Sequence, residues 1–179
     1  LFGRPPHVMK PDWLKINLTS KKSSGETAGI LARHHMNTIC TSGLCPNRTE
    51  CWAARTATLM IGGEICTRKC RFCNTLSGRP NALNPNEPQH VAESIKALNL
   101  RYAVITSVDR DDLPDYGADH WVKTVEAVQQ LNPDTKIELL IPDFMGKREL
   151  IKKVLATKPH VCGHNMETVR RLTPSVRSV

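Results

Sequence analysis

The sequence contains no long apolar run and no recognisable export signal. None of its apolar stretches approaches the roughly 20 residues that a helix needs to cross a bilayer. Its beginning, LFGRPPHVMKPDW, lacks the basic-then-apolar pattern of a secretory signal. With 40% hydrophobic residues, the composition also lacks the extremes of a disordered or fibrous chain. We therefore expect a soluble globular protein without a membrane segment, located in the cytoplasm or, in a eukaryote, in an organelle matrix.

The sequence also lacks an initial methionine. It begins at Leu1, and its last segment, LTPSVRSV, interrupts a helical pattern. We therefore expect the 179 residues to be part of a longer chain whose C-terminal portion is not included.

Cysteine, in contrast, is abundant and clustered. Six of the seven cysteines fall into two trios. A reducing compartment does not sustain structural disulfides, so this pattern indicates metal binding or thiol chemistry. The first trio is Cys40, Cys45 and Cys51, and the second trio is Cys66, Cys70 and Cys73.

The pattern of apolar residues divides the chain in two. Residues 1–55 are polar and carry no sustained period, which predicts an irregular N-terminal arm with a short helix near residues 26–35. Residues 56–179 alternate short apolar runs with amphipathic segments, which is typical of an α/β domain with a parallel sheet. The predicted strands are 58–61, 102–106, 136–141 and 160–162, and the predicted helices are 87–100, 117–131 and 147–157. This indicates about four βα units, a partial parallel (β/α) barrel.

Unusual polar segments follow each predicted strand. In parallel β/α folds the chemistry lies at the carboxyl ends of the strands, so these segments point to one site. Gly62 and Gly63 allow a tight turn after the first strand. The segments are GGEICTRKCRFCNT, SVDRDD, PDF and GHNMET.

Three cysteines on one loop leave a tetrahedral centre one ligand short. Zinc is one possibility, although none of the seven histidines lies at a finger-like spacing from a cysteine pair. A 4Fe-4S cluster held by Cys66, Cys70 and Cys73 leaves one iron open to bind a substrate or cofactor. Phe72 precedes Cys73 and can shield such a cluster or pack on a bound base.

The motif CTRKCRFC resembles the C-x3-C-x-aromatic-C signature of radical S-adenosylmethionine enzymes. The whole chain resembles the lipoyl synthase family. This resemblance extends over most of residues 10–177, and the C-x4-C-x5-C trio ahead of the radical motif distinguishes that family. It is carried, in order, by CTSGLCPNRTECW, TATLMIGGEICTRKCRFCNT, ITSVDRDDL, IELLIPDF and HNMETV.

The resemblance implies a barrel of the radical SAM type and two 4Fe-4S clusters. The cluster at the second trio would bind S-adenosyl-L-methionine and reduce it to methionine and a 5'-deoxyadenosyl radical. That radical would remove hydrogen from the sixth and eighth carbons of an octanoyl-lysine, where sulfur is then inserted. Implied partners are octanoylated lipoyl-carrier domains, namely the glycine cleavage H protein or 2-oxoacid dehydrogenase E2 subunits. An electron donor such as a ferredoxin or flavodoxin is also implied.

The first trio, by the same resemblance, holds an auxiliary cluster that supplies the sulfur. Its fourth ligand in the family is a serine of an Arg-Ser-Ser segment, which this sequence does not contain. Arg177 and Ser178 lie in a different context and are not assigned that role. Cys162 is an alternative ligand, but a small buried thiol is the commoner role for a single cysteine.

Four further residues are candidates for cofactor contacts, beside Phe72. Ser107 and Asp109 follow the second strand and can bind the ammonium, ribose or sulfonium groups of the cofactor. Strand alternation allows Glu138 to face the barrel interior. Asn165 is the preferred contact after the fourth strand. Helix capping is the competing interpretation for Asn165 and for residues 109–112.

The formal net charge of +8 leaves other functions open. It suits a nucleic-acid surface or an acidic protein partner, and it also arises if an acidic remainder is missing. The alternatives are a radical SAM tRNA methylthiotransferase and a non-catalytic, zinc-stabilised nucleic-acid-binding module. The order of the trios and the SVDRDD and HNMET segments favour lipoyl synthase chemistry, and a nucleic-acid partner is not expected.

Overall fold

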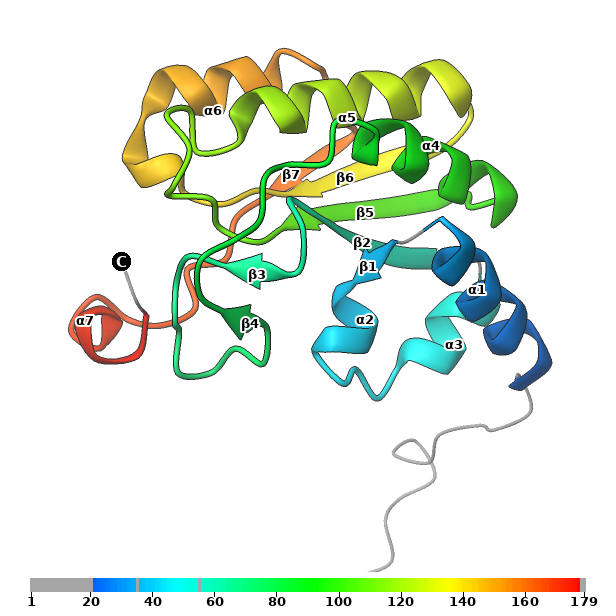
Figure 1. Ribbon diagram of the computed structural model, residues 1–179, viewed down its shortest axis with the longest axis horizontal. Coiled ribbons are helices and arrows are strands. Elements are labelled where there is room, and N and C mark those ends of the chain that lie inside the picture. The colour runs from blue at the N-terminus through cyan, green and yellow to red at the C-terminus, as the bar shows by residue number, and fades with distance from the viewer. Residues whose placement is uncertain (1–20, 35, 55, 178–179) are drawn as a thin grey trace, which may run out of the picture.

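A five-stranded sheet organises the computed structural model, which describes residues 21–34, 36–54 and 56–177 (Figure 1). Four of its strands are parallel, and the short strand β1 is antiparallel to β2 at one edge. The strand order is β1 (Asn37–Thr38), β2 (Thr56–Ile61), β5 (Tyr102–Ser107), β6 (Lys136–Leu140) and β7 (Val161–Gly163). The four predicted strands are confirmed to within two residues at each end.

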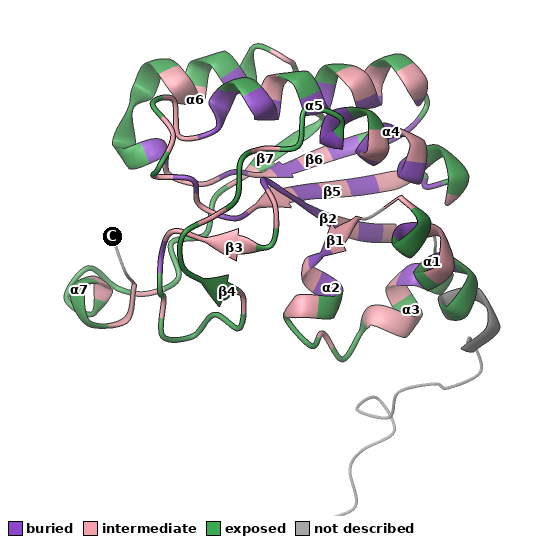
Figure 2. Ribbon diagram, in the orientation of Figure 1, coloured by how far each residue is buried: buried purple, intermediate pink, exposed green. Residues whose placement is uncertain are grey.

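Three helices cover one face of this sheet, as the βα alternation predicts (Figure 1). Their apolar stripes recur every three or four residues and point at the strands, which buries them (Figure 2). The spacing of Leu150, Ile151, Val154 and Leu155 predicts an apolar stripe on the helix at residues 147–157, but Leu155 departs from it, because it is 41% exposed. The helices are α4 (Glu87–Ala97), α5 (Ala118–Leu131) and α6 (Arg148–Leu155).

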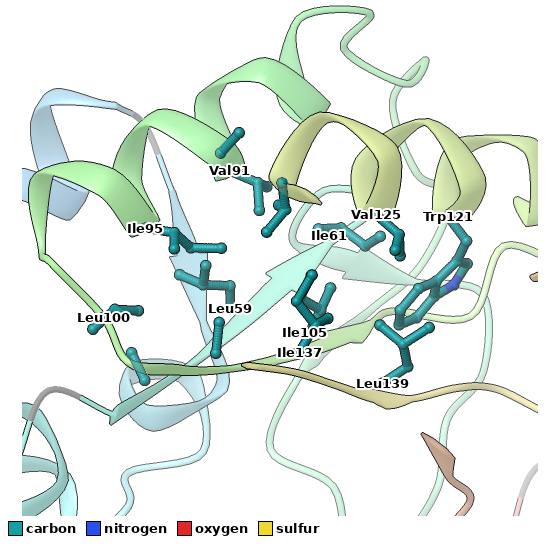
Figure 3. Packing of buried hydrophobic residues seen from close by; sticks show 14 of the residues in the cluster. Leu59, Ile61, Val91, Ile95, Leu100, Ile105, Trp121, Val125, Ile137 and Leu139 are labelled. Atoms are coloured by element: carbon teal, nitrogen blue, oxygen red, sulfur yellow. The ribbon is translucent and has the colours of Figure 1, made fainter. Parts of the chain in front are cut away.

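The hydrophobic core lies between these helices and the sheet (Figure 3). Leu59, Ile105 and Leu139 from successive strands are fully buried against Val91 and Val125 of the helices. Each fully buried aliphatic side chain of this kind contributes about 1.5–3 kcal/mol relative to exposure. The opposite face of the same strands is only half buried.

The segment expected to be an irregular arm is more regular than its polar sequence predicts. Its first 20 residues lie outside the described part of the chain. Residues 21–34 and 36–54 contain the strand β1 and three helices, α1 (Lys21–Arg33), α2 (Ile39–Ser42) and α3 (Arg48–Ala53). Three apolar residues of this segment, Leu31, Cys40 and Trp52, are buried in the core cluster. The arm therefore packs along β1 and β2 as part of the same body (Figure 1).

Shorter elements surround the carboxyl ends of the strands. The loop after β2 contains β3 (Ile65–Cys66), paired in parallel with β4 (Leu76–Ser77). A 3-10 turn, η3 (Phe144–Gly146), follows β6, and the short helix α7 (Thr173–Val176) lies near the end of the chain. No helix in the described part of the chain combines the length and apolarity of a membrane span.

Candidate cluster and cofactor site

The loop that carries the second trio, residues 62–78, is called the cysteine loop below. It starts with a turn at Gly62 and Gly63, whose φ angles are +84° and +93°, as the sequence predicts. The Glu87 carboxylate accepts hydrogen bonds from the Gly62 N–H at 2.8 Å and from the Gly63 N–H at 3.4 Å. The His120 Nε2 atom lies 2.5 Å from the same carboxylate. A buried acid therefore fixes the point where the loop leaves β2.

The cysteine loop is also joined to the end of β5. The Thr67 N–H and hydroxyl both donate to the Asp109 carbonyl oxygen, at 3.1 and 3.0 Å, and the hydroxyl also lies 3.0 Å from Asp111 Oδ2. The predicted meeting of strand-end segments is thus confirmed for β2 and β5.

Backbone amides donate to the sulfur atoms of two cysteines of the second trio, Cys66 and Cys73. Cys66 Sγ accepts N–H groups from Arg68 at 3.4 Å and Asp109 at 3.3 Å, and Cys73 Sγ accepts the Thr75 N–H at 3.5 Å. Burial raises the pKa of Cys66, while the two N–H groups lower it. N–H donors stabilise the thiolate form, which is the form that binds iron. The donor set therefore fits a metal-bound thiolate.

The first trio is gathered by α2 and α3. The Cys45 N–H donates to the Cys40 carbonyl at 3.2 Å, and Cys51 lies within the six-residue helix α3. Burial raises the pKa of Cys51, and the neighbouring Cys40 and Cys45 raise it further. Three thiolates this close repel one another, and a cationic centre removes that repulsion. This trio also fits a metal cluster.

Neither trio is arranged around a single ion. Among the described residues, no three His, Cys, Asp or Glu side chains converge closely enough to hold one metal ion. Mononuclear zinc requires four such donors within about 2.3 Å of one point. The ligands of an iron–sulfur cube bind different irons, so they stand farther apart. Three thiols in each trio are ligands of the kind that hold an iron–sulfur cluster.

A cavity of about 110 Å³ opens at the carboxyl ends of β5, β6 and β7. Three predicted cofactor residues, Ser107, Asp109 and Asn165, line it together with Arg177. The Ser107 hydroxyl is buried and has no hydrogen-bond partner among the described residues. Burial raises the pKa of Asp109, although Arg68 lowers it. An unpaired donor and a partly buried acid, whose side chain is 22% exposed, are suited to a polar, partly cationic ligand.

The other two predicted contacts lie elsewhere. Glu138 faces the half-buried side of the sheet and accepts the Tyr102 hydroxyl at 2.5 Å, a bond that raises the pKa of Tyr102. Phe72 is 52% exposed on the cysteine loop. Neither residue lines the cavity of Ser107 and Asn165, so their role as cofactor contacts stays a prediction.

The structure corrects three competing interpretations. Residues 109–112 cap no helix, because α5 begins only after Gly117, and the Asp115 carboxylate accepts its first N–H groups. Asn165 caps none either, since α7 begins at Thr173. Cys162 is an exposed thiol in β7 and not the buried one expected, because β7 is a sheet edge.

Arg68 is a buried charged residue of the site that the sequence does not predict. Arg68 is 4% exposed and pairs with Asp111 and Asp143, which follow β5 and β6. Nothing in the local pattern CTRKC separates this arginine from the neighbouring Lys69, which is an ordinary loop charge. Its role becomes visible only in the folded protein, where Arg68 contacts Asp143, 75 residues away in the sequence.

A larger cavity of about 800 Å³ lies beside the segments that carry the two trios, although none of the six cysteines lines it. Its walls combine apolar side chains, such as Leu31, Met36 and Met60, with residues adjoining both trios. Asn74, next to Cys73, donates from its side chain to the Ser42 carbonyl at 2.6 Å. The segments that hold the two trios are therefore in direct contact.

Comparison with known proteins agrees with this geometry. The sequence model of the Radical SAM superfamily matches residues 60–177. Proteins named lipoyl synthase are 60% identical over 173 residues in Porphyromonas gingivalis, 58% over 172 in Parabacteroides distasonis and 55% over 169 in Treponema denticola. These matches cover 97, 96 and 94% of this chain, but the chain spans only 61, 61 and 58% of those proteins.

The comparison confirms the sequence-based family and fold predictions. The α/β sheet with its cysteine-rich N-terminal region agrees with a partial radical SAM barrel. The predicted cofactors, S-adenosyl-L-methionine and two 4Fe-4S clusters, are those of this family. Because the superfamily model matches well over half of its residues, the chain belongs to the radical SAM superfamily.

Proposed function

We propose that the protein acts as a lipoyl synthase, inserting two sulfur atoms into a protein-bound octanoyl-lysine at its sixth and eighth carbons. The proposal is supported by the superfamily membership and by the name of the relatives. Those relatives favour sulfur insertion into an acyl chain over the tRNA methylthiotransferase alternative. No amino-acid side chain is basic enough to deprotonate an alkane carbon, so radical chemistry from a cofactor is required.

The observation that carries the proposal is the contact between the two cysteine-bearing segments. Sulfur insertion requires a radical source and a sulfur source that reach the same carbon chain. The Asn74–Ser42 hydrogen bond of 2.6 Å joins the two segments, and both border the cavity of about 800 Å³. Cavities that bind small molecules usually measure about 300–1,000 Å³, so this one has room for an acyl chain. Its apolar residues, such as Leu31, Met36 and Met60, suit the hydrocarbon part of that substrate.

The two trios have different roles in this proposal. Cys66, Cys70 and Cys73 would hold the cluster that binds S-adenosyl-L-methionine, which, on reduction, supplies the hydrogen-abstracting radical. Cys40, Cys45 and Cys51 would hold the auxiliary cluster that provides sulfur. The second trio thus starts the reaction, and the first trio supplies the sulfur of the product.

The cofactor contacts are proposed from the small cavity beside Cys66. Asp109 connects the two features, because its N–H donates to Cys66 Sγ while the residue lines the cavity. The Ser107 hydroxyl and the Asn165 side chain would bind polar groups of the cofactor there. Since about 110 Å³ is less than a whole nucleoside ligand needs, the remainder would extend over the half-buried sheet face toward Glu138. Phe72 would cover the cluster from the loop.

The proposed macromolecular partners are lipoyl-carrier domains and an electron donor. Candidates are the glycine cleavage H protein, E2 subunits, and a ferredoxin or flavodoxin. The net charge of +8 and the exposed Lys152, Arg170 and Arg171 support docking of acidic proteins. The seven free cysteines suit a reducing compartment, so the proposed location is the cytoplasm or an organelle matrix.

The test is anaerobic reconstitution followed by a turnover assay. The full-length protein that contains this chain is incubated with S-adenosyl-L-methionine, dithionite and an octanoyl-lysine peptide, and the products are analysed by mass spectrometry. We expect 5'-deoxyadenosine together with a peptide mass gain of two sulfur atoms for the dithiol product, or of two sulfur atoms less two hydrogens once it is oxidised to the cyclic disulfide. 5'-Deoxyadenosine without any sulfur-containing peptide would refute the proposed function, and no 5'-deoxyadenosine would also refute the role of the second trio.

A further inference from the structure

Arg68 lies between Cys66 and Cys70 and is held by two carboxylates at once. Its Nε and Nη2 atoms donate to Asp111 at 2.8 and 2.9 Å, and its Nη1 and Nη2 atoms donate to Asp143 at 2.7 and 2.8 Å. The side chain is only 3% exposed. Two bidentate pairs on one guanidinium use nearly all of its donors and fix its plane.

This arrangement fixes the backbone around the cysteines. The Arg68 N–H donates to Cys66 Sγ, and the Arg68 carbonyl accepts the Ser77 hydroxyl at 2.9 Å from the other side of the loop. The Arg68 side chain is thus fixed by Asp111 and Asp143, while the N–H and carbonyl groups of Arg68 bond to Cys66 and Ser77 within the loop. A loop of this length is otherwise held to the sheet mainly at Thr67 and at the glycine turn.

Arg68 also balances a concentration of negative charge. Asp109 Oδ1 lies 3.6 Å from Nη1, in addition to the paired Asp111 and Asp143. Burial lowers the pKa of Arg68, but hydrogen bonds to Asp143 and Asp111 outweigh it and raise the pKa above its ordinary value. The cation is therefore permanently charged. Asp143 also pairs with Arg177 at 3.2 Å, but among the described residues Asp111 would have no other guanidinium partner. Without Arg68, the Asp109 carboxylate, 3.7 Å from Cys66 Sγ, would face a thiolate that must be anionic to bind iron, with less positive charge to offset it.

We propose that Arg68 is a positioning residue that presets Cys66, Cys70 and Cys73 for cluster binding by tying their loop to the ends of β5 and β6. Its pairing with Asp111 and Asp143 holds the loop and the adjacent cofactor cavity as one unit. The inference rests on the proposed assignment of the second trio to the cluster that binds S-adenosyl-L-methionine. It is independent of the acyl substrate.

The test compares Arg68→Gln and Arg68→Lys in a background that carries only one cluster. Replacing Cys40, Cys45 and Cys51 by alanine removes the auxiliary site, so iron and sulfide report on the second trio alone. Changes in residues that orient metal ligands typically cost about 10–100-fold in metal affinity. We expect Arg68→Gln to weaken cluster retention against a chelator at least tenfold. Its reduced cluster should also show a more negative midpoint potential, because a nearby positive charge is lost.

The lysine variant separates charge from geometry. Arg68→Lys keeps the cation but cannot form two forks, so we expect the midpoint potential to be largely restored while chelator resistance stays low. Adding S-adenosyl-L-methionine should change the electron paramagnetic resonance spectrum of the cluster less in both variants than in the parent, or give broader signals. A purely structural role would not separate potential from retention in this way.

Asn132→Ala is the matched control for lost stability. The buried Asn132, at the C-terminal end of α5 and away from both trios, donates from its side-chain amide to the Ala92 carbonyl of α4 and the Val128 carbonyl of α5. It should lower the unfolding temperature and leave chelator resistance unchanged. Chelator resistance of Arg68→Gln equal to that of Asn132→Ala would overturn the proposal. If Arg68→Gln does not fold, unchanged chelator resistance in Arg68→Lys would overturn it instead. Normal cluster and cofactor cleavage without sulfur insertion in the parent protein would refute only the proposed function.

Discussion

Asn74 donates a 2.6 Å hydrogen bond from its side-chain amide to the carbonyl oxygen of Ser42. The two residues are 32 positions apart, and each lies next to or near a cysteine of a different trio. The bond is exposed, so its contribution to stability is at most about 1 kcal/mol. Its significance is geometric, because it sets how the two cysteine-bearing segments face the cavity between them.

Asn74→Ala should therefore lower the amount of sulfur inserted per cofactor cleavage more than it lowers the stability of the fold. We expect 5'-deoxyadenosine formation to stay within about twofold of the parent rate, since the second trio is intact, while sulfur inserted per cleavage event falls severalfold. Mass spectrometry of an octanoyl peptide and quantification of 5'-deoxyadenosine give this ratio. Gln89→Ala, which removes an exposed side-chain amide bonded to Glu93 on α4, is the control and should leave the ratio unchanged. An unaltered ratio in Asn74→Ala would contradict the geometric role.

Glu87→Ala should destabilise the turn that opens the cysteine loop. It removes the acceptor of the Gly62 N–H and the partner of His120, leaving buried polar groups unsatisfied. The expected loss is about 1–3 kcal/mol in the free energy of unfolding, measured by urea denaturation of the metal-free protein. Glu93→Ala removes a partly exposed acid of the same helix, whose partners are Gln89 and His34, and should cost less than about 1 kcal/mol. Equal costs for the two variants would show that the Glu87 contacts do not matter.

Trp121→Ala tests the core between the sheet and α5. The side chain is 2% exposed and packs in the main hydrophobic cluster, so its removal should cost about 3–5 kcal/mol. Leu155→Ala, at a side chain that is 41% exposed, should cost much less. Urea midpoints in the metal-free protein measure both, and similar losses would contradict the observed orientation of α6.

Asp143 should contribute a pH-dependent part of the stability. Its hydrogen bonds to Arg68 lower its pKa from 3.8 to about 2 in the folded protein. Because the folded pKa is depressed, this stabilisation is fully present above pH 3.8 and is lost as pH falls toward about 2. The stability difference between the parent and Asp143→Asn should thus be constant between about pH 5 and about pH 7 and shrink below pH 3.8. Denaturation of the metal-free proteins measures it, and a constant difference down to about pH 2 would contradict the ion pair.

The spacing of apolar residues predicted the sheet and its helices, because the apolar side of each element is the side that is buried. The stripe of Trp121, Val125 and Val128 recurs at helical spacing, and all three are buried in α5. Leu155 shows the limit of that rule: it lies at the end of α6, where the stripe turns away from the sheet. The short helices of the arm have too few apolar residues for any period, and they are ordered by tertiary contacts with β1 and β2.

The cysteines of the site could be predicted from spacing, whereas the groups that hold them could not. In a reducing compartment, three thiols spaced this closely along the chain indicate a shared metal centre. The partners of Arg68 come from strand ends 43 and 75 residues away, and only the parallel sheet brings them together. The same is true of Glu87. In the sequence it is an ordinary acid in the first turn of α4, and only the structure shows that it accepts a hydrogen bond from the Gly62 N–H. Long-range pairing of this kind leaves no local signal.

The most direct test of the two-trio proposal is a pair of single substitutions assayed side by side. Cys70→Ala and Cys45→Ala are each reconstituted anaerobically and incubated with S-adenosyl-L-methionine, dithionite and an octanoyl-lysine peptide. We predict that Cys70→Ala forms no 5'-deoxyadenosine, whereas Cys45→Ala forms it but adds no sulfur to the peptide. Loss of 5'-deoxyadenosine in both variants alike, or sulfur insertion by Cys45→Ala, would contradict the separate roles of the two trios.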